Sequence, residues 1–127
     1  MPLYSITDLK IITRIPHDRE NRPIINRIPH RDYDKIIEEL NRRIDEVVDS
    51  DEELITAGWI PGNNWDETVW APISVAASGD SQRSGMVFGA IVFEVMMNRP
   101  EDWSLGKYQI DGRDIGSTTY FRIKRDK

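Results

Sequence analysis

The chain has 127 residues, a mass of 14.7 kDa and no cysteine, and its 17 basic and 22 acidic side chains give a net charge of −5. One domain over residues 1–127 is expected at this length, and the lack of cysteine excludes disulfides, cysteine nucleophiles and thiolate metal sites. The longest apolar stretch, Met86 to Met97, is too short for a membrane span, so a cytoplasmic protein is expected.

The charge is unevenly distributed along the sequence. Residues 1–31 and residues 107–127 each hold six basic against three acidic side chains, whereas the residues between them hold five against sixteen. If the two ends meet in one sheet, they form a basic surface suited to a compact anion, while the net negative charge argues against bulk nucleic acid. The alternative is that these charges belong to two solvated edge strands.

A short repeat, Ile-Ile-x-Arg-Ile-Pro-His, occurs at residues 11–17 and again at residues 24–30. Its β-branched residues predict two short strands, each ended by its proline, and the polar segment 17–22 predicts the turn of an N-terminal hairpin. The two histidines of the chain, His17 and His30, occupy matching positions of the repeat. Without a third ligand at metal spacing, they predict no metal site.

The hydrophobic period changes at Asp32, which can cap a helix. Apolar residues at helical spacing from Tyr33 to Val48 predict an amphipathic helix of about 17 residues. A shorter helix is expected after it, with Ser50 and Glu53 spaced as a capping box and Gly58 at its end.

Residues 58–72 hold three of the four tryptophans, among them Trp70. Pro61-Gly62 and Asn63-Asn64 predict an irregular loop here. Tryptophans concentrated in one loop either fill the core or form the wall of a binding pocket, and both interpretations stay open for this segment.

A second long helix is predicted from the helix-start residues 78–81 to Asn98, ahead of Pro100. It is apolar on almost every side, and one small chain can cover such a helix completely only with difficulty, so a homodimer that buries part of it is predicted. Its one carboxylate, Glu94, could act as a general acid if buried, or could be paired with an arginine or lie at the surface.

The pair Asp111-Gly112 predicts a C-terminal hairpin with strands at residues 107–110 and 117–124, which places Arg113 at the rim of the turn. Together these elements predict an α+β fold. In it, an antiparallel sheet with N- and C-terminal hairpins packs on the long apolar central helix and on the amphipathic helix.

The sequence contains no phosphate-binding loop, dinucleotide fingerprint, zinc-protease motif or nucleophile elbow. Its binding groups are arginines for phosphate, aromatic rings for a base, and Asn98, which offers a donor and an acceptor. Phe88 and Asn98 are about 15 Å apart along the predicted helix and about 80° apart around it, so one ligand meets both only if it is nucleotide-sized or bound by two subunits. Alternatively, Phe88 belongs to the core and Asn98 ends the helix.

The segment Ser84 to Pro100, between the tryptophan-rich loop and a short basic hairpin, resembles the bacteriophage Thoeris anti-defence sponge proteins of the first type described. The resemblance covers roughly residues 55–123, and its main feature is the pair Phe88 and Asn98. It implies a protein of the host cytoplasm that binds a cyclic ADP-ribose-type signal, holds it intact and keeps a bacterial immune effector inactive. Neither a catalytic residue nor a cofactor is expected under this resemblance.

The resemblance also implies a homo-oligomer built from dimers, with the ligand at the dimer interface and, in some members, separate sites for cyclic oligonucleotides. By position, Phe88 would stack on the adenine and Asn98 would bond to the polar edge of the ligand. Arg113 would meet the pyrophosphate, and Arg27 or Arg31 would complete the phosphate clamp. Trp70 is the candidate from the tryptophan-rich loop for the pocket wall.

Two functions of other classes stay open. A cyclic-nucleotide-cleaving enzyme would use Glu94 or a carboxylate from Asp66 or Glu67. A host-protein interaction module would bind through the acidic middle of the chain, in a salt-sensitive manner.

Overall fold

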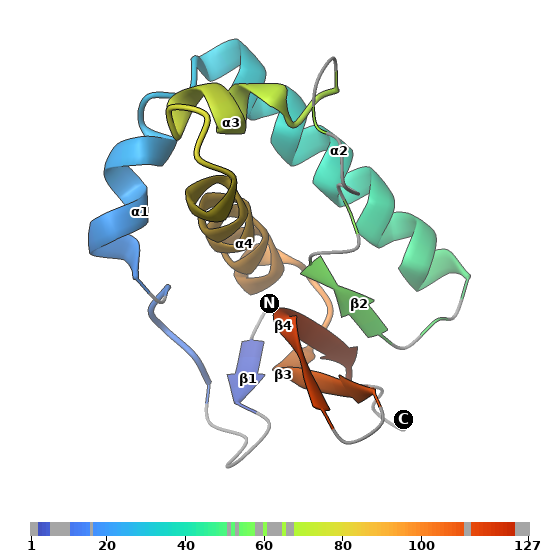
Figure 1. Cartoon of the computed structure of the whole chain (residues 1–127). Helices are drawn as coiled ribbons and strands as arrows, with labels where there is room; N and C mark the ends of the chain where they lie inside the picture. Colours follow the sequence, from blue (N-terminus) through green and yellow to red (C-terminus); the bar gives the residue numbers. More distant parts are fainter. Residues whose placement is uncertain are drawn as a thin grey trace.

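The computed structural model describes residues 3–5, 11–15, 17–50, 52, 54–57, 60, 65, 68–110 and 113–123, without the side chains of residues 5, 107–110 and 113–117. The elements are β1 (Leu3–Ser5), α1 (Asp18–Ile25), α2 (His30–Asp49), β2 (Leu54–Thr56), α3 (Ala71–Ala76), α4 (Ser81–Asn98), β3 (Trp103–Ile110) and β4 (Arg113–Arg122). Figure 1 shows α4 nearly end-on, with α1, α2 and α3 around it and the sheet on its remaining side. The predicted α+β class is therefore confirmed.

The four strands form one mixed sheet in the order β1-β3-β4-β2. β3 and β4 pair antiparallel, which confirms the C-terminal hairpin, although both strands begin earlier than predicted. β2 adds to β4 antiparallel, whereas β1 lies parallel to β3, so the expectation of a purely antiparallel sheet is wrong. The predicted turn residues Asp111 and Gly112 lie outside the described ranges.

The predicted N-terminal hairpin is wrong, because helix α1 occupies residues 18–25. Acidic side chains in its first turn favour a helix start, and its buried face packs on α4. Pro23 removes one backbone hydrogen bond from this helix, so packing rather than intrinsic propensity stabilises it. The two repeat copies therefore have different structures: the first precedes α1, and the second spans the end of α1 and the start of α2.

The amphipathic helix is confirmed as α2, which begins two residues before Asp32 and buries Ile36, Leu40 and Ile44. The shorter helix predicted after it is wrong, because residues 54–56 form strand β2 at the edge of the sheet. Ser50 instead ends α2, with its backbone N–H bonded to the carbonyl of Glu46. Pairing with β4 favours the extended conformation of this β-branched segment over the helix that its capping pattern suggested.

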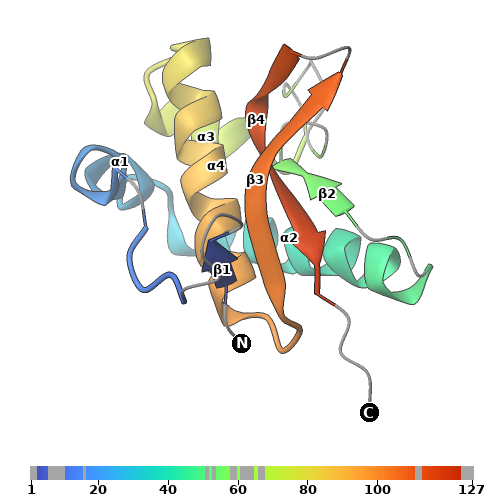
Figure 2. The ribbon, with the colours of Figure 1, turned by 90° about the horizontal axis from the view of Figure 1, so that it is seen from below.

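The central helix is confirmed as α4, which begins after Asp80, whose carboxylate accepts a hydrogen bond from the backbone N–H of Arg83 at 2.9 Å. Most of its apolar residues are buried within this one chain: Val87, Phe88, Ala90, Ile91, Val92, Phe93, Val95 and Met96. Figure 2 shows the helix running alongside the sheet, with α1 on its other side. One chain thus covers this helix, so incomplete coverage is no argument for a dimer, and the dimer stays a prediction from the resemblance.

Within the described ranges, no helix combines the length and the apolar character that a membrane span requires.

Candidate functional site

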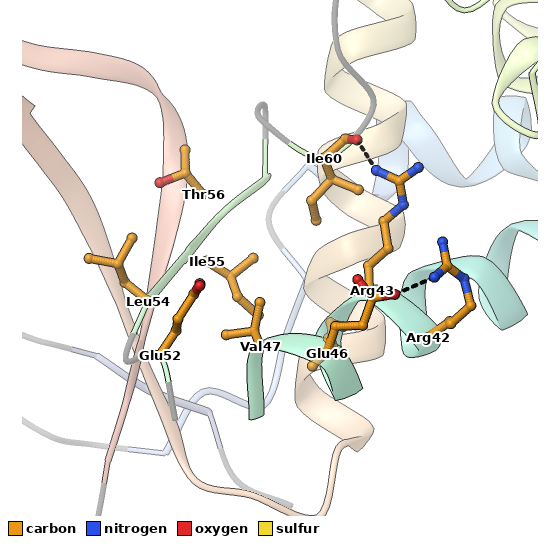
Figure 3. Close-up of a pocket in the computed structure, with 10 residues that line it drawn as sticks. Arg42, Arg43, Glu46, Val47, Glu52, Leu54, Ile55, Thr56 and Ile60 are labelled. Atoms are coloured by element: carbon orange, nitrogen blue, oxygen red, sulfur yellow. Dashed lines mark hydrogen bonds and ion pairs between the residues drawn. The ribbon is translucent and has the colours of Figure 1, made fainter. Parts of the chain in front are cut away.

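Two cavities lie against helix α2, one between α2 and α4 and the other between α2 and β2. The cavity between α2 and α4, called here the Asn98 cavity, has a volume of about 250 Å³ and is lined by Tyr33, Ile37, Asn41, Glu94, Val95 and Asn98. The cavity between α2 and β2, called here the β2 cavity, has a volume of about 290 Å³ (Figure 3). Among the predicted ligand-binding residues whose side chains the structure describes, Asn98 lines the first cavity and none lines the second. Glu94, the candidate general acid, lines the first cavity with Asn98.

The Asn98 cavity joins one aromatic ring to two side-chain amides. Asn98 is exposed at the end of α4, and its Nδ2 donates to the carbonyl oxygen of Glu94 at 2.9 Å. Tyr33 lies opposite on the first half of α2, and its partial burial, together with the charge of Glu94, raises the pKa of its hydroxyl. The hydroxyl is therefore a neutral hydrogen-bonding group at physiological pH.

Glu94 forms an ion pair across two helices. Its carboxylate accepts a hydrogen bond from Arg22 of α1 at 2.5 Å, and Arg22 also contacts Asp18 at 3.0 Å. The hydrogen bond to Glu94 raises the pKa of the Arg22 guanidinium. The sequence left Glu94 open as a general acid or as an arginine partner, and the structure gives it the arginine. Asp66 and Glu67, the other carboxylates considered for cleavage, lie outside the described ranges.

The second amide of the cavity, Asn41, is held from behind by Arg99. The Arg99 guanidinium donates to Asn41 Oδ1 at 3.1 Å, and Asn41 Nδ2 donates to the carbonyl oxygen of Ile37. Arg99 also pairs with Asp45 at 2.7 Å and with Glu101 at 2.9 Å, while its side chain is only 9% exposed. This network ties the C-terminal end of α4 to the middle of α2, and so fixes one side of the cavity.

Phe88 and Trp70 come together, but in the core rather than in a cavity. Each is only 2% exposed, and their rings meet edge to face with centroids 5.2 Å apart. Trp65 packs on the same Phe88 ring at 5.6 Å. The alternative that placed Phe88 in the core is thus confirmed, and in this conformation the ring has no open face on which an adenine could stack.

The predicted arginines are dispersed over the chain. Arg27 lies between α1 and α2 and donates to the carbonyl oxygen of Ala76 at 3.4 Å, while Arg31 is exposed in the first turn of α2. Arg113 is the first residue of β4 and pairs with Ile110 of β3, and its side chain is not among those that the structure describes. β1 pairs with residues 103–105 of β3, and none of the paired residues is basic. The side chains of Lys107 and Arg113 lie outside the description, so the basic surface stays a prediction.

The β2 cavity has an apolar floor and a charged rim. Side chains of β2 lie on one side and those of α2 on the other, as Figure 3 shows, and the lining residues are Arg42, Arg43, Ile44, Glu46, Val47, Glu52, Leu54, Ile55, Thr56 and Ile60. Arg43 also extends toward the tryptophan-rich loop: its guanidinium donates to the carbonyl oxygen of Ile60 at 2.6 Å and lies 5.5 Å from the centre of the Trp70 ring.

Glu39 organises both arginines of this rim. It accepts two hydrogen bonds from Arg42, at 2.6 and 2.8 Å, and one from Arg43 at 2.7 Å. The hydrogen bonds from Arg42 are the main cause that lowers the pKa of the Glu39 carboxyl from 4.5 to about 2.

This lowered pKa predicts a pH dependence of stability. Because the folded pKa lies below the unfolded one, the contribution of Glu39 is complete above pH 4.5 and is lost as the pH falls toward 2. Glu39→Gln is expected to lower the free energy of unfolding by up to about 1 kcal/mol at pH 7, with the difference shrinking below pH 4.5 and vanishing only below about pH 2. Urea unfolding of both proteins across this range measures it.

The neighbouring Glu38, exposed on the same helix, supplies the control. Glu38→Gln is expected to match the wild type throughout. A difference between Glu39→Gln and the wild type that stays constant from pH 7 to pH 2.5 would contradict the assigned ion pairs.

Two residues of the Asn98 cavity were missed by sequence reasoning. Tyr33 counted there only as part of the apolar stripe of the amphipathic helix. Asn41 was not singled out, although it follows Ile37 by four residues and interrupts the apolar face with a carboxamide. A polar residue within such a stripe is a signal that could have marked the cavity.

Searches of protein-family models, of curated proteins and of solved structures found no match to this chain.

Proposed function

We propose that this protein binds a cyclic ADP-ribose-type signalling nucleotide and holds it without cleaving it, so that a bacterial immune effector in the host cytoplasm is not activated. The observation that carries the proposal is the position of Asn98. It is the residue that the resemblance assigns to the polar edge of the ligand, and it lines a cavity together with the aromatic ring of Tyr33.

The chemistry of these two side chains suits an adenine. Asn98 uses one N–H on the carbonyl oxygen of Glu94, and within the described residues its second N–H and its carbonyl oxygen form no further hydrogen bond. A carboxamide with a free donor and a free acceptor matches the N6 and N7 edge of adenine. Tyr33 supplies the ring for stacking, the role that the resemblance gave to the buried Phe88.

The size of the cavity limits how much of the ligand it encloses. A volume of about 250 Å³ lies just below the usual range for drug-sized ligands, about 300–1,000 Å³. We therefore place only the nucleoside part in the cavity. The pyrophosphate then lies outside the cavity. We assign it to Arg27, to Arg31, or to Arg113 of a second copy of the chain, in keeping with the proposed dimer.

Retention without cleavage is supported by the state of Glu94. Glu94 is the carboxylate among the described lining residues of the cavity, and its ion pair with Arg22 occupies it. A general acid must be free to reach the leaving group, whereas an oxygen of this carboxylate is already bonded to the Arg22 guanidinium.

We expect Asn98→Ala to weaken the binding of cyclic ADP-ribose by at least about fivefold, because two hydrogen bonds to the base contribute about 1–3 kcal/mol. Asn98 is exposed, so the variant should fold as the wild type does. Calorimetric titration of both proteins measures the change in affinity.

The matched control is Gln82→Ala, an amide substitution at an exposed position on the same helix, and it should leave the affinity unchanged. Equal affinities of Asn98→Ala and the wild type would contradict the proposed site. Ligand turnover that stops in Glu94→Gln would instead favour the cleaving enzyme. Salt-sensitive capture of one host protein, with no nucleotide bound, would favour the interaction module.

A further inference from the structure

The β2 cavity has no part in the proposed nucleotide site. It is formed by the second half of α2, by β2 and by Ile60, whereas the Asn98 cavity uses the first half of α2 and the end of α4. Its apolar surface comes from both sides, with Val47 of α2 facing Ile55 of β2 (Figure 3). Such a surface suits a short hydrocarbon body of a ligand.

The two arginines of the rim suggest an anion site at first sight, but their charges are already matched. Arg42 pairs with both Glu39 and Glu46, and Arg43 pairs with Glu39 and also donates to the carbonyl oxygen of Ile60. An incoming phosphate or carboxylate would have to displace these carboxylates. The paired arginines therefore supply little net attraction for an anion.

Glu52 is the charged group of the rim without such a match. Its side chain is exposed, and among the described residues it forms no ion pair. With Glu39 and Glu46 included, three carboxylates stand against two guanidinium groups around the cavity. In the sequence, Glu52 also belongs to an acidic run with Asp49 and Asp51. Because Glu39 and Glu46 match the two arginines, Glu52 leaves one unmatched negative charge beside the cavity.

We propose that the β2 cavity binds a small organic cation, an ammonium group on a short apolar stem, with the stem on Val47 and Ile55 and the cation beside Glu52. The volume of about 290 Å³ suits a ligand of this size. This site lies apart from Asn98, so the protein would carry one cavity for a nucleotide base and another for an amine.

The test titrates the full chain with three probes that share one stem: hexylammonium, 1-hexanol and hexanoate. Backbone amide NMR signals of Val47, Leu54 and Ile55 report binding at the cavity. Hexylammonium is expected to bind about fivefold more tightly than hexanol, and hexanoate more weakly than hexanol, because one exposed ion pair changes affinity by about this factor. High salt should reduce the advantage of hexylammonium and leave hexanol unaffected.

Glu52→Gln should abolish the preference for hexylammonium and keep the binding of hexanol, which also shows that the apolar floor is intact. Asp49→Asn, which removes an acidic side chain of the same run that does not line the cavity, should keep most of the preference. The proposal is overturned if hexanoate binds as tightly as hexylammonium, or if Glu52→Gln retains the preference for hexylammonium. It is also overturned if Asp49→Asn loses this preference to the same extent as Glu52→Gln. A fourth contradicting result is that no probe shifts the three amide signals at 10 mM, a concentration on the order of a weak fragment affinity. None of these outcomes bears on the nucleotide site, which the Asn98 variant tests separately.

Discussion

Phe88→Ala is expected to lower the free energy of unfolding by about 3–5 kcal/mol. Phe88 is 2% exposed and lies between the rings of Trp65 and Trp70, so alanine would leave a cavity between α4 and the residues that precede α3. Chemical denaturation measures the change. Met86→Ala, at a position 40% exposed on the same helix, should cost much less and serves as the control.

A second substitution at this position distinguishes the core role of Phe88 from the stacking role that the resemblance assigned to it. Phe88→Leu keeps most of the volume and removes the aromatic ring, and such exchanges in a core cost about 1.5 kcal/mol or less. If the ring belongs only to the core, this variant should bind cyclic ADP-ribose as tightly as the wild type. A loss of affinity above tenfold in a folded Phe88→Leu protein would show that the ring turns toward the ligand.

Arg99→Met is expected to lower the free energy of unfolding by about 3–5 kcal/mol. The Arg99 side chain is 9% exposed and contacts Asp45, Glu101 and Asn41, so its removal leaves a half-buried carboxylate without its cation. Burial by itself raises the pKa of Glu101, but the hydrogen bonds from Arg99 and Trp103 outweigh it and keep this pKa lowered.

A double variant tests whether the unpaired charge is the cause. Arg99→Met combined with Glu101→Gln should recover part of the loss, because the carboxylate left behind is then neutral. Urea denaturation of the wild type, both single variants and the double variant gives the coupling. Additive effects of the two substitutions would contradict the ion pair, and an Arg99→Met protein as stable as the wild type would contradict the network as a whole.

The helices α2 and α4 and the C-terminal hairpin could be predicted because their signals are local. The stripe from Ile36 to Ile44 has the period of a helix, Asp80 is a strong N-cap, and Asp111-Gly112 between two β-forming runs favours a hairpin. In each case propensity and burial favour the same conformation.

The wrong predictions concern segments where tertiary contacts decide between two local options. The Ile-Ile pairs at residues 11–12 and 24–25 have the same β propensity, yet only the second pair lies in a helix, because α1 packs on α4 and its Arg22 pairs with Glu94. Residues 54–56 form a strand because their backbone pairs with the edge of β4.

The candidate site was predictable only in part for the same reason. Asn98 could be singled out from its position at the end of an apolar helix. Its neighbours Tyr33 and Asn41 lie more than 50 positions earlier in the sequence, and only the packing of α2 on α4 brings them together. Phe88 was assigned to the ligand by position along the helix, but its direction into the core depends on where Trp65 and Trp70 pack.

The most direct test of the proposed function is to mix the purified protein with cyclic ADP-ribose, remove the unbound ligand, release the bound ligand by heat and determine its mass. We predict that nucleotide is recovered in amounts comparable to the protein and with the mass of the intact ring. Recovery of a hydrolysed product, or of no nucleotide at all, would contradict capture without chemistry.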